Sequence, residues 1–141
     1  MTIGAILHGR TSAVVSARPD DTVRAVIDLL AQHRIGAVPV VDGNAIVGIF
    51  SERDLVRLMS SYGPEALDRR LDEVMTKSPV TCDSRMAVIA ALSQMTQKRI
   101  RHLPVVDDGA LVGFVSIGDL VKYRIDHIEA EAAAMRDYIA S

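Results

Sequence analysis

Two segments of the chain share one pattern of glycine, serine and aspartate: Gly48 to Asp54 (GIFSERD) and Gly113 to Asp119 (GFVSIGD). In each, the serine follows an apolar run and stands where it would cap the next helix. A helix N-terminus presents unpaired N–H groups and a partial positive charge, which suits a phosphate or another polar ligand. The aspartate, three positions after the serine, could accept hydrogen bonds from a ribose diol. A capping box, in which the acid reaches back to the cap's own N–H, explains the same residues equally well.

Other reactive residue types are poorly placed for chemistry. No histidine has a second metal ligand at a useful spacing, and the two motif serines have no histidine base nearby. The single cysteine, Cys82, can form no intramolecular disulfide and is predicted to be a strand residue. We therefore expect a protein that is not an enzyme, requires no cofactor and holds no metal.

Composition and charge narrow the class of protein further. The 141 residues are 49% hydrophobic and 24% charged, which is typical of a globular chain. A formal charge of −2 gives no general attraction to nucleic acid or anionic lipid, and no apolar run is long enough to span a bilayer. Met1 to Leu7 lacks the features of a signal peptide, so we expect a cytoplasmic protein that binds neither nucleic acid nor membrane. Five basic residues are predicted to be solvated surface or phosphate contacts: Arg69, Arg70, Lys98, Arg99 and Arg101.

The chain repeats itself at an offset of 65 positions. Arg34 to Arg57 aligns with Arg99 to Lys122 without a gap, and thirteen of these twenty-four positions are identical. The register continues upstream, where Thr11 falls on Thr76. A unit of about 60 residues is marginally stable alone. We therefore expect the two copies to pair around a pseudo-two-fold axis and to bury their shared apolar faces in one core.

Each copy is predicted to fold in the order strand, helix, strand, strand, helix. The leading strands are Val14 to Ser16 and Val80 to Cys82. The first helices are expected to be capped by Asp20 or Asp21 and by Asp83 or Ser84, and to end near Arg34 and Arg99. The hairpin strands are Ala37 to Val41 with Ile46 to Phe50, and Leu103 to Val106 with Leu111 to Val115. Ser51 and Ser116 are expected to cap the second helices.

Two segments lie outside these units. Ser60 to Arg70, with the pair Gly63-Pro64, is predicted to be a surface linker. Past Arg124, apolar residues recur at spacings of 3, 4, 3 and 4, as in a coiled-coil seam: Ile125, Ile128, Ala132, Met135 and Ile139. This stripe either packs on its own module or pairs with a second copy. We predict a homodimer.

The doubled pattern resembles the cystathionine-β-synthase (CBS) domain family, as a tandem pair with no catalytic or transport domain attached. Besides the two motifs, Pro39 to Asp42 and Pro104 to Asp107 (both PVVD) carry the resemblance, which covers nearly the whole chain. It implies an α/β (α+β) fold of two β-α-β-β-α repeats around a pseudo-two-fold axis, to which a C-terminal helix is added. We place the first repeat at residues 1–64, the linker and second repeat at 65–125, and the amphipathic C-terminal helix at 126–141.

The resemblance also implies two symmetry-related clefts that hold AMP, ADP, ATP, NAD(H), S-adenosylmethionine or a related ligand. By similarity, each cleft takes its ribose carboxylate from one repeat and its base-lining backbone mainly from the other. The first cleft would use Ser116 and Asp119, with Thr11, Val14, Ile35, Gly36 and Ala37 around the base. The second would use Ser51 and Asp54, with Thr76, Val80 and Ile100. Arg53, Arg101 and His102 match phosphate-facing positions.

The two copies differ where phosphate would lie, which predicts unequal sites. Gly36-Ala37 corresponds to Arg101-His102, and Arg53 corresponds to Gly118. We expect a regulatory module that binds an adenine nucleotide or NAD(H) and signals to a partner protein. The alternative is a constitutive dimerisation or scaffold module with vestigial clefts. Nucleotide retained through purification would favour the first interpretation, and indifference to every nucleotide the second.

Overall fold

An antiparallel hairpin forms in each repeat where the sequence predicts it, in a computed structural model that describes all 141 residues. β1 (Ala37–Asp42) pairs with β2 (Ala45–Ser51), and β4 (His102–Asp107) pairs with β5 (Ala110–Ser116). Both hairpins have a register shift at the same place, between Val40 and Val41 and between Val105 and Val106. Such bulges increase the local twist of the strands.

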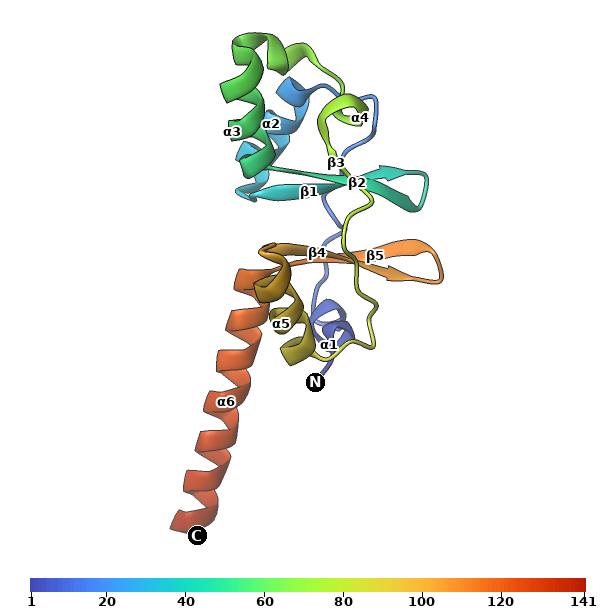
Figure 1. Cartoon of the computed structure of the whole chain (residues 1–141). Coiled ribbons are helices and arrows are strands. Elements are labelled where there is room, and N and C mark those ends of the chain that lie inside the picture. The colour runs from blue at the N-terminus through green and yellow to red at the C-terminus, as the bar shows by residue number, and fades with distance from the viewer.

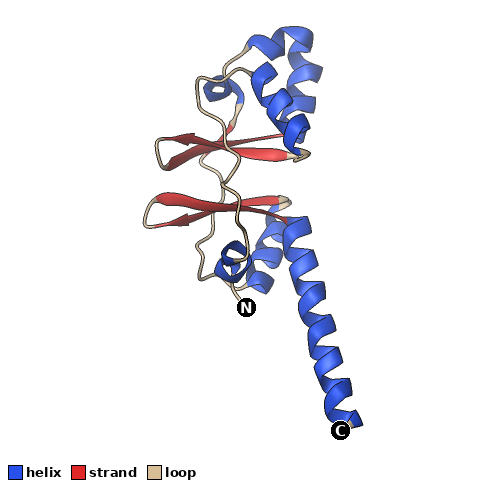
Figure 2. Ribbon diagram, turned by 180° about the vertical axis from the view of Figure 1, so that it is seen from behind, coloured by secondary structure: helices blue, strands red, loops and turns tan.

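Helices cover the outer faces of the hairpins, and the hairpins face each other in the middle of the molecule (Figure 1). The helices are α2 (Val23–His33) and α3 (Glu52–Tyr62) in the first repeat, and α5 (Val88–Lys98) and α6 (Ile117–Ala140) in the second. The view from behind shows the same stacking of the two units (Figure 2). The N–H of Leu111 donates to the carbonyl of Asn44 at 2.9 Å and links the two hairpins. The α/β fold of two related repeats with a C-terminal helix is confirmed.

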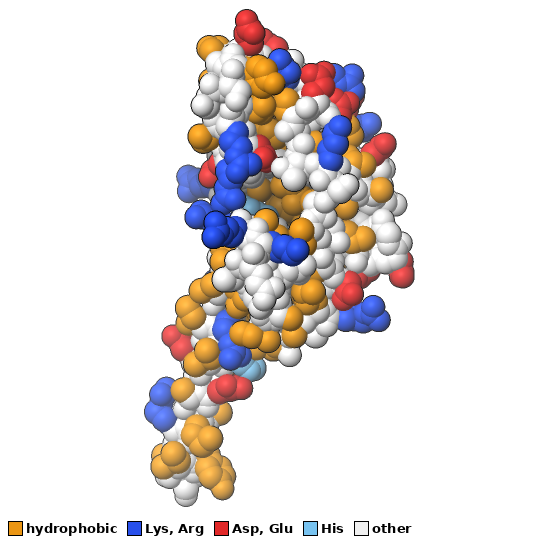
Figure 3. All heavy atoms as spheres, viewed as in Figure 1, with side chains coloured by type: hydrophobic (Ala, Val, Ile, Leu, Met, Phe, Trp, Pro, Cys, Tyr) orange, Lys and Arg blue, Asp and Glu red, His pale blue; other side chains and the backbone are white.

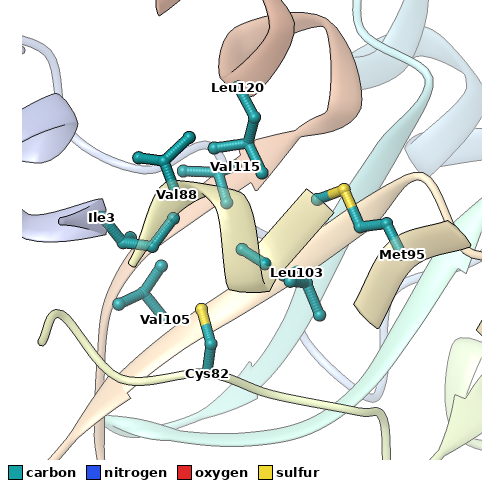
Figure 4. Packing of buried hydrophobic residues seen from close by; sticks show 9 residues of the cluster. Ile3, Cys82, Val88, Met95, Leu103, Val105, Val115 and Leu120 are labelled. Atoms are coloured by element: carbon teal, nitrogen blue, oxygen red, sulfur yellow. The ribbon is translucent and has the colours of Figure 1, made fainter. Parts of the chain in front are cut away.

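The prediction of one shared core is wrong, because the buried side chains form two separate clusters. The first core cluster contains Ala17, Val23, Val26, Leu30, Val38, Val40, Phe50 and Leu71. The second core cluster contains Ile3, Cys82, Val88, Ala91, Met95, Leu103, Val105, Val115 and Leu120, most of which are labelled in Figure 4. Each repeat therefore has its own apolar interior between hairpin and helices.

The repeats are joined instead by an exchange of short helices. α1 (Ile3–His8), which the sequence analysis did not predict, lies at the start of the first repeat's segment but packs on the second repeat (Figure 1). Its Ile3 is fully buried and donates its N–H to the carbonyl of Met86 at 2.9 Å. α4 (Leu71–Val74) precedes the second repeat but packs on the first, where Leu71 is fully buried. Each core is thus completed by a segment that leads into the other repeat.

The leading strands are shorter than predicted. Val14 to Ser16 and Val80 to Cys82 form no strand, and only single residues bridge to the hairpins, Ala17 to Val40 and Cys82 to Val105. A proline occupies the pairing region of each hairpin (Pro39 and Pro104) and has no N–H to donate. A short strand that was not predicted, β3 (Thr76–Lys77), pairs with β2.

Two further predictions about helix ends and the linker need correction. The cap of α2 is Thr22, whose hydroxyl accepts from the N–H of Ala25 at 3.2 Å, and α5 begins after Ala87 with no side-chain cap.

The predicted surface linker is largely structured. α3 continues to Tyr62, and the 3₁₀ helix η1 (Gly63–Asp68) follows with Ala66 fully buried. The Gly63-Pro64 pair therefore starts a packed turn of helix.

The C-terminal stripe does not pack on its own module. α6 runs without a break from the second hairpin to Ala140 and extends away from the body of the molecule (Figure 1). The large apolar residues of this stripe are exposed, from 48% at Ile128 to 76% at Ile139. None of the helices combines the length and apolar character needed to cross a membrane.

Candidate functional site

Both serine and aspartate motifs form complete capping boxes. Asp54 Oδ2 accepts the N–H of Ser51 at 2.9 Å, and the N–H of Asp54 donates to Ser51 Oγ at 3.3 Å. At the start of α6, Asp119 Oδ2 accepts the N–H of Ser116 at 2.8 Å, and the N–H of Asp119 donates to Ser116 Oγ at 3.1 Å. Each box uses one carboxylate oxygen of its aspartate. Capping therefore accounts for the pattern without excluding a second role for the other oxygen.

Two clefts lie between the repeats, one at each motif. The first cleft, which contains Ser116 and Asp119, has a volume of about 740 Å³, and the second cleft, which contains Ser51 and Asp54, about 570 Å³. Val14, Ile35, Gly36 and Ala37 line the first cleft as expected, whereas Thr11 does not. Thr76, Val80, Ile100, Arg53 and Arg101 all line the second cleft. His102 and Gly36 line both clefts.

The glycine of each motif makes room for a crossing segment. A Cβ on Gly113 would lie 2.6 Å from both methyl carbons of Leu7 in α1. A Cβ on Gly48 would lie 2.9 Å from the carbonyl oxygen of Thr76 and 2.5 Å from Met75 Sδ. Gly48 is required because the carbonyl of Thr76 is backbone and cannot turn away, whereas a side chain at position 113 would force Leu7 to move.

The first cleft holds its aspartate in an ion pair. Arg10 Nη2 lies 2.8 Å from Asp119 Oδ2, and Arg10 Nη1 donates to the carbonyl of Phe114 at 2.7 Å. Burial acts to raise the pKa of Asp119, but the N–H of Ser116 and the guanidinium of Arg10 together outweigh it, and the pKa lies below its ordinary value. Asp119 is therefore charged near neutral pH.

The second cleft holds its aspartate with neutral donors. Thr76 Oγ1 donates to Asp54 Oδ1 at 3.2 Å, and Ser51 Oγ donates to Asp54 Oδ2 at 3.0 Å. Arg53 lies beside it and donates from Nη1 to the carbonyl of Arg99 at 3.2 Å, which links α3 of the first repeat to the end of α5 in the second. Lys and Arg side chains gather beside the hollow between the repeats in Figure 3.

His102 separates the two clefts. Its ring stacks on Phe114 with centroids 5.5 Å apart and planes inclined by 10°. Burial lowers the pKa of His102, and the carboxylates of Asp119 and Glu52 oppose that change without reversing it. At neutral pH the ring is therefore uncharged and offers a ligand a hydrogen bond and a flat surface.

Sequence reasoning missed several cleft residues. Arg10, Arg34, Glu52 and Arg57 line the clefts but were not proposed as site residues. Arg10 had no sequence signal, because its role depends on the unpredicted path of α1. Of the five basic residues predicted to be solvated surface or phosphate contacts, Lys98, Arg99 and Arg101 line the second cleft. Arg69 instead lies over the Tyr62 ring at 4.1 Å, and Arg70 pairs with Asp72 at 2.7 Å.

The remaining candidate residues for chemistry are the potential metal ligands and the single thiol. No three His, Cys, Asp or Glu side chains are grouped so that they could hold a metal ion. Cys82 lies in the second core cluster, where burial, followed by the charges of Asp83 and Asp107, raises the pKa of its thiol to about 11 (Figure 4). The thiol is therefore protonated at neutral pH and acts as a small packing residue.

Known proteins share both the sequence pattern and the fold. The CBS domain family model matches residues 4–61 and 71–126. The chain is 34% identical over 125 residues to the mitochondrial CBS domain-containing protein CBSX3 of Arabidopsis thaliana, with 85% of this chain covered and 61% of that one.

Solved structures give the same result. The CBS-domain containing protein ATU1752 from Agrobacterium tumefaciens superposes with a TM-score of 0.82 at 36% identity, covering 87% of this chain and 92% of that one. The CBS domain protein PAE2072 from Pyrobaculum aerophilum, solved with AMP, superposes with a TM-score of 0.75 at 28% identity, covering 84% and 89%. The chain belongs to the CBS domain family and contains a pair of CBS repeats.

Proposed function

We propose that this protein is a non-enzymatic, cytoplasmic regulatory module that binds an adenosine-containing nucleotide in the clefts between its repeats. The observation that carries the proposal is the composition of each cleft: a carboxylate from one repeat faces backbone and apolar side chains of the other. The AMP complex of the Pyrobaculum relative supports this ligand class. The ribose diol would bind the aspartate, and the base would lie against the opposite repeat.

The position of Asp119 on α6 would allow ligand binding to affect a partner protein. Asp119 lies in the first turn of α6, whose far end extends beyond the body of the molecule. A ligand that contacts both Asp119 and the Ile35 to Ala37 segment would favour one angle between the repeats, and therefore one direction of α6. Such a switch requires different affinities for the two arrangements. The regulated partner would detect the position of this helix.

We test the proposal by calorimetric titration with AMP, ADP, ATP and NADH, and by thermal unfolding with the same ligands. A ligand at one hundred times its Kd should stabilise the protein by about 2.7 kcal/mol. Asp119→Ala and Asp54→Ala should each weaken binding at their own cleft, and Asp126→Ala, on the exposed part of α6, should not. Because alanine also removes a cap, circular dichroism must show that the variants are folded.

The outcomes separate two functions. Affinities that neither cleft variant changes would reject the assignment of the aspartates. A wild-type protein that binds none of the four ligands would favour the constitutive scaffold.

We also propose that α6 pairs with α6 of a second copy in a parallel homodimer. The stripe of Ile125, Ile128, Ala132, Met135 and Ile139 is exposed along one face, and the charges beside it fit this partner. In a parallel pair, Arg124 would face Glu129 of the partner helix, and Glu131 would face Arg136, because flanking residues five positions apart meet across the seam. An antiparallel pair centred on Ala130 would instead bring Glu131 close to Glu131 of the other helix. The charge pattern therefore favours a parallel second copy.

A further inference from the structure

The second cleft concentrates positive charge that no carboxylate neutralises. Its lining includes five cationic residues, Arg53, Arg57, Lys98, Arg99 and Arg101, and two acidic ones, Glu52 and Asp54. None of the five cations forms an ion pair within 4.0 Å, although six such pairs occur elsewhere in the chain. The first cleft has two cationic residues, Arg10 and Arg34, and Arg10 is paired with Asp119.

These cations come from different elements that line the same cleft. Arg53 and Arg57 lie one turn apart on α3, where like charges repel, and Lys98 and Arg99 lie at the end of α5 in the other repeat. The helix dipole favours cations at the C-terminal end of a helix, which explains the positions of Lys98 and Arg99 at the end of α5. It does not explain Arg53 and Arg57, which lie at the start and middle of α3. The hydrogen bond from Arg53 to the Arg99 carbonyl holds the two groups together. A multivalent anion bound between them would reduce the electrostatic repulsion within the α3 group and within the α5 group.

We propose that the two clefts select ligands by charge: the second cleft takes an adenosine ligand with a chain of two or three phosphates, and the first takes one with at most one phosphate. This inference rests on the proposed function, since it assigns ligand classes to the same two clefts. In the second cleft, Asp54 accepts the ribose hydroxyls, and Arg53, Arg57, Lys98 and Arg101 surround the phosphates. In the first cleft, Arg34 is the one cation without a carboxylate partner.

The test uses the full chain and calorimetric titration with ATP, ADP, AMP, adenosine and inorganic tripolyphosphate. Asp54→Asn and Asp119→Asn identify the cleft, because asparagine keeps a cap acceptor and removes the charge. ATP binding should be lost in Asp54→Asn and kept in Asp119→Asn. Arg57→Ala with Lys98→Ala should weaken ATP and tripolyphosphate binding by about a hundredfold or more, since each of the two lost charged contacts is worth about one decade in Kd or more. Adenosine binding should change little.

A matched double variant controls for net charge. Lys122→Ala with Arg85→Ala removes two exposed cations that lie outside both clefts and outside the proposed helix pair, and should leave ATP affinity unchanged. The Kd for ATP should also rise more steeply with salt than the Kd for AMP, because more charge is screened.

The inference is overturned if ATP binding depends on Asp119 rather than Asp54, or if the cleft and control double variants weaken ATP equally. Failure of the proposed function looks different. In that case neither adenosine nor any nucleotide binds, while tripolyphosphate, which needs only the cations, still distinguishes the cleft variant from the control.

Discussion

The two clefts contain the same serine and aspartate motif, but the side chains that contact this motif from outside the repeat differ. In both, serine and aspartate form a capping box, which is a property of the repeat itself. The second contact of the aspartate comes from the segment that leads into the other repeat: Arg10 reaches Asp119, whereas Thr76 reaches Asp54. At the offset of 65, the counterpart of Arg10 is Met75 and that of Thr76 is Thr11. The repeat thus builds the cap, and the crossing segment determines whether the aspartate is paired with a cation or with a neutral donor.

In the cores, too, a crossing segment completes what each repeat builds. Substitutions in these segments are expected to have the largest effects on stability. Leu71→Ala and Ile3→Ala each remove a fully buried side chain that a crossing helix supplies to the opposite repeat. Each should lower the free energy of unfolding by about 2–5 kcal/mol, measured by urea denaturation. Ile89→Ala, in α5 but 61% exposed, is the control and should change stability by about 0.5 kcal/mol or less. If Ile3→Ala behaves like the control, α1 does not complete the second core.

The next contrast is between the equivalent helices α3 and α6. α3 ends at Tyr62 after 11 residues, whereas α6 continues for 24 and exposes its apolar stripe. Glu131→Arg should weaken the parallel dimer, because it places two cations where Glu131 would face Arg136. Adding Arg136→Glu should restore dimerisation, as measured by light scattering with size exclusion. Ala130→Arg, on the opposite side of α6, controls for added charge, and equal dissociation in all three variants would contradict the parallel arrangement.

Local patterns predicted the hairpins well and the crossings poorly. The strands of both hairpins extend only one residue or so beyond the predicted ranges, because short apolar runs on either side of a Gly-containing turn determine them locally. The caps at Ser51 and Ser116 were predictable for the same reason. The shared core and Thr11 as a cleft residue depended on where α1 and α4 lie, and the surface linker failed because Ala66 of η1 is buried. Ile3, Ile6 and Leu7 have helical spacing, but nothing in that spacing says which repeat they cover.

The cleft residues show the same division. Those transferred from the family pattern line the clefts almost without exception, because backbone position within a repeat fixes them. Arg10 and Arg57 were missed for different reasons. Arg10 reaches its cleft through tertiary structure, and Arg57 looks like one of many exposed helix cations until Lys98 and Arg99 are placed opposite it.

The smallest predicted effect tests the Arg10 contact directly. Arg10→Met gives the first cleft the residue that stands at the equivalent position before the second repeat. Because Arg10 and Asp119 side chains are 34% and 40% exposed, losing their ion pair should lower stability at pH 7 by about 0.2–1 kcal/mol. The folded-state pKa of Asp119 lies below its unfolded value, so this stabilisation is fully present above about pH 4 and is lost as pH falls further. Urea denaturation of both proteins from pH 7 to pH 3 should therefore show a difference that shrinks below pH 4. Arg18→Met, which breaks an exposed ion pair outside both clefts, is the control and should lower stability by less. If the stability difference between wild type and Arg10→Met instead stays constant down to pH 3, Arg10 stabilises the protein by packing rather than by charge.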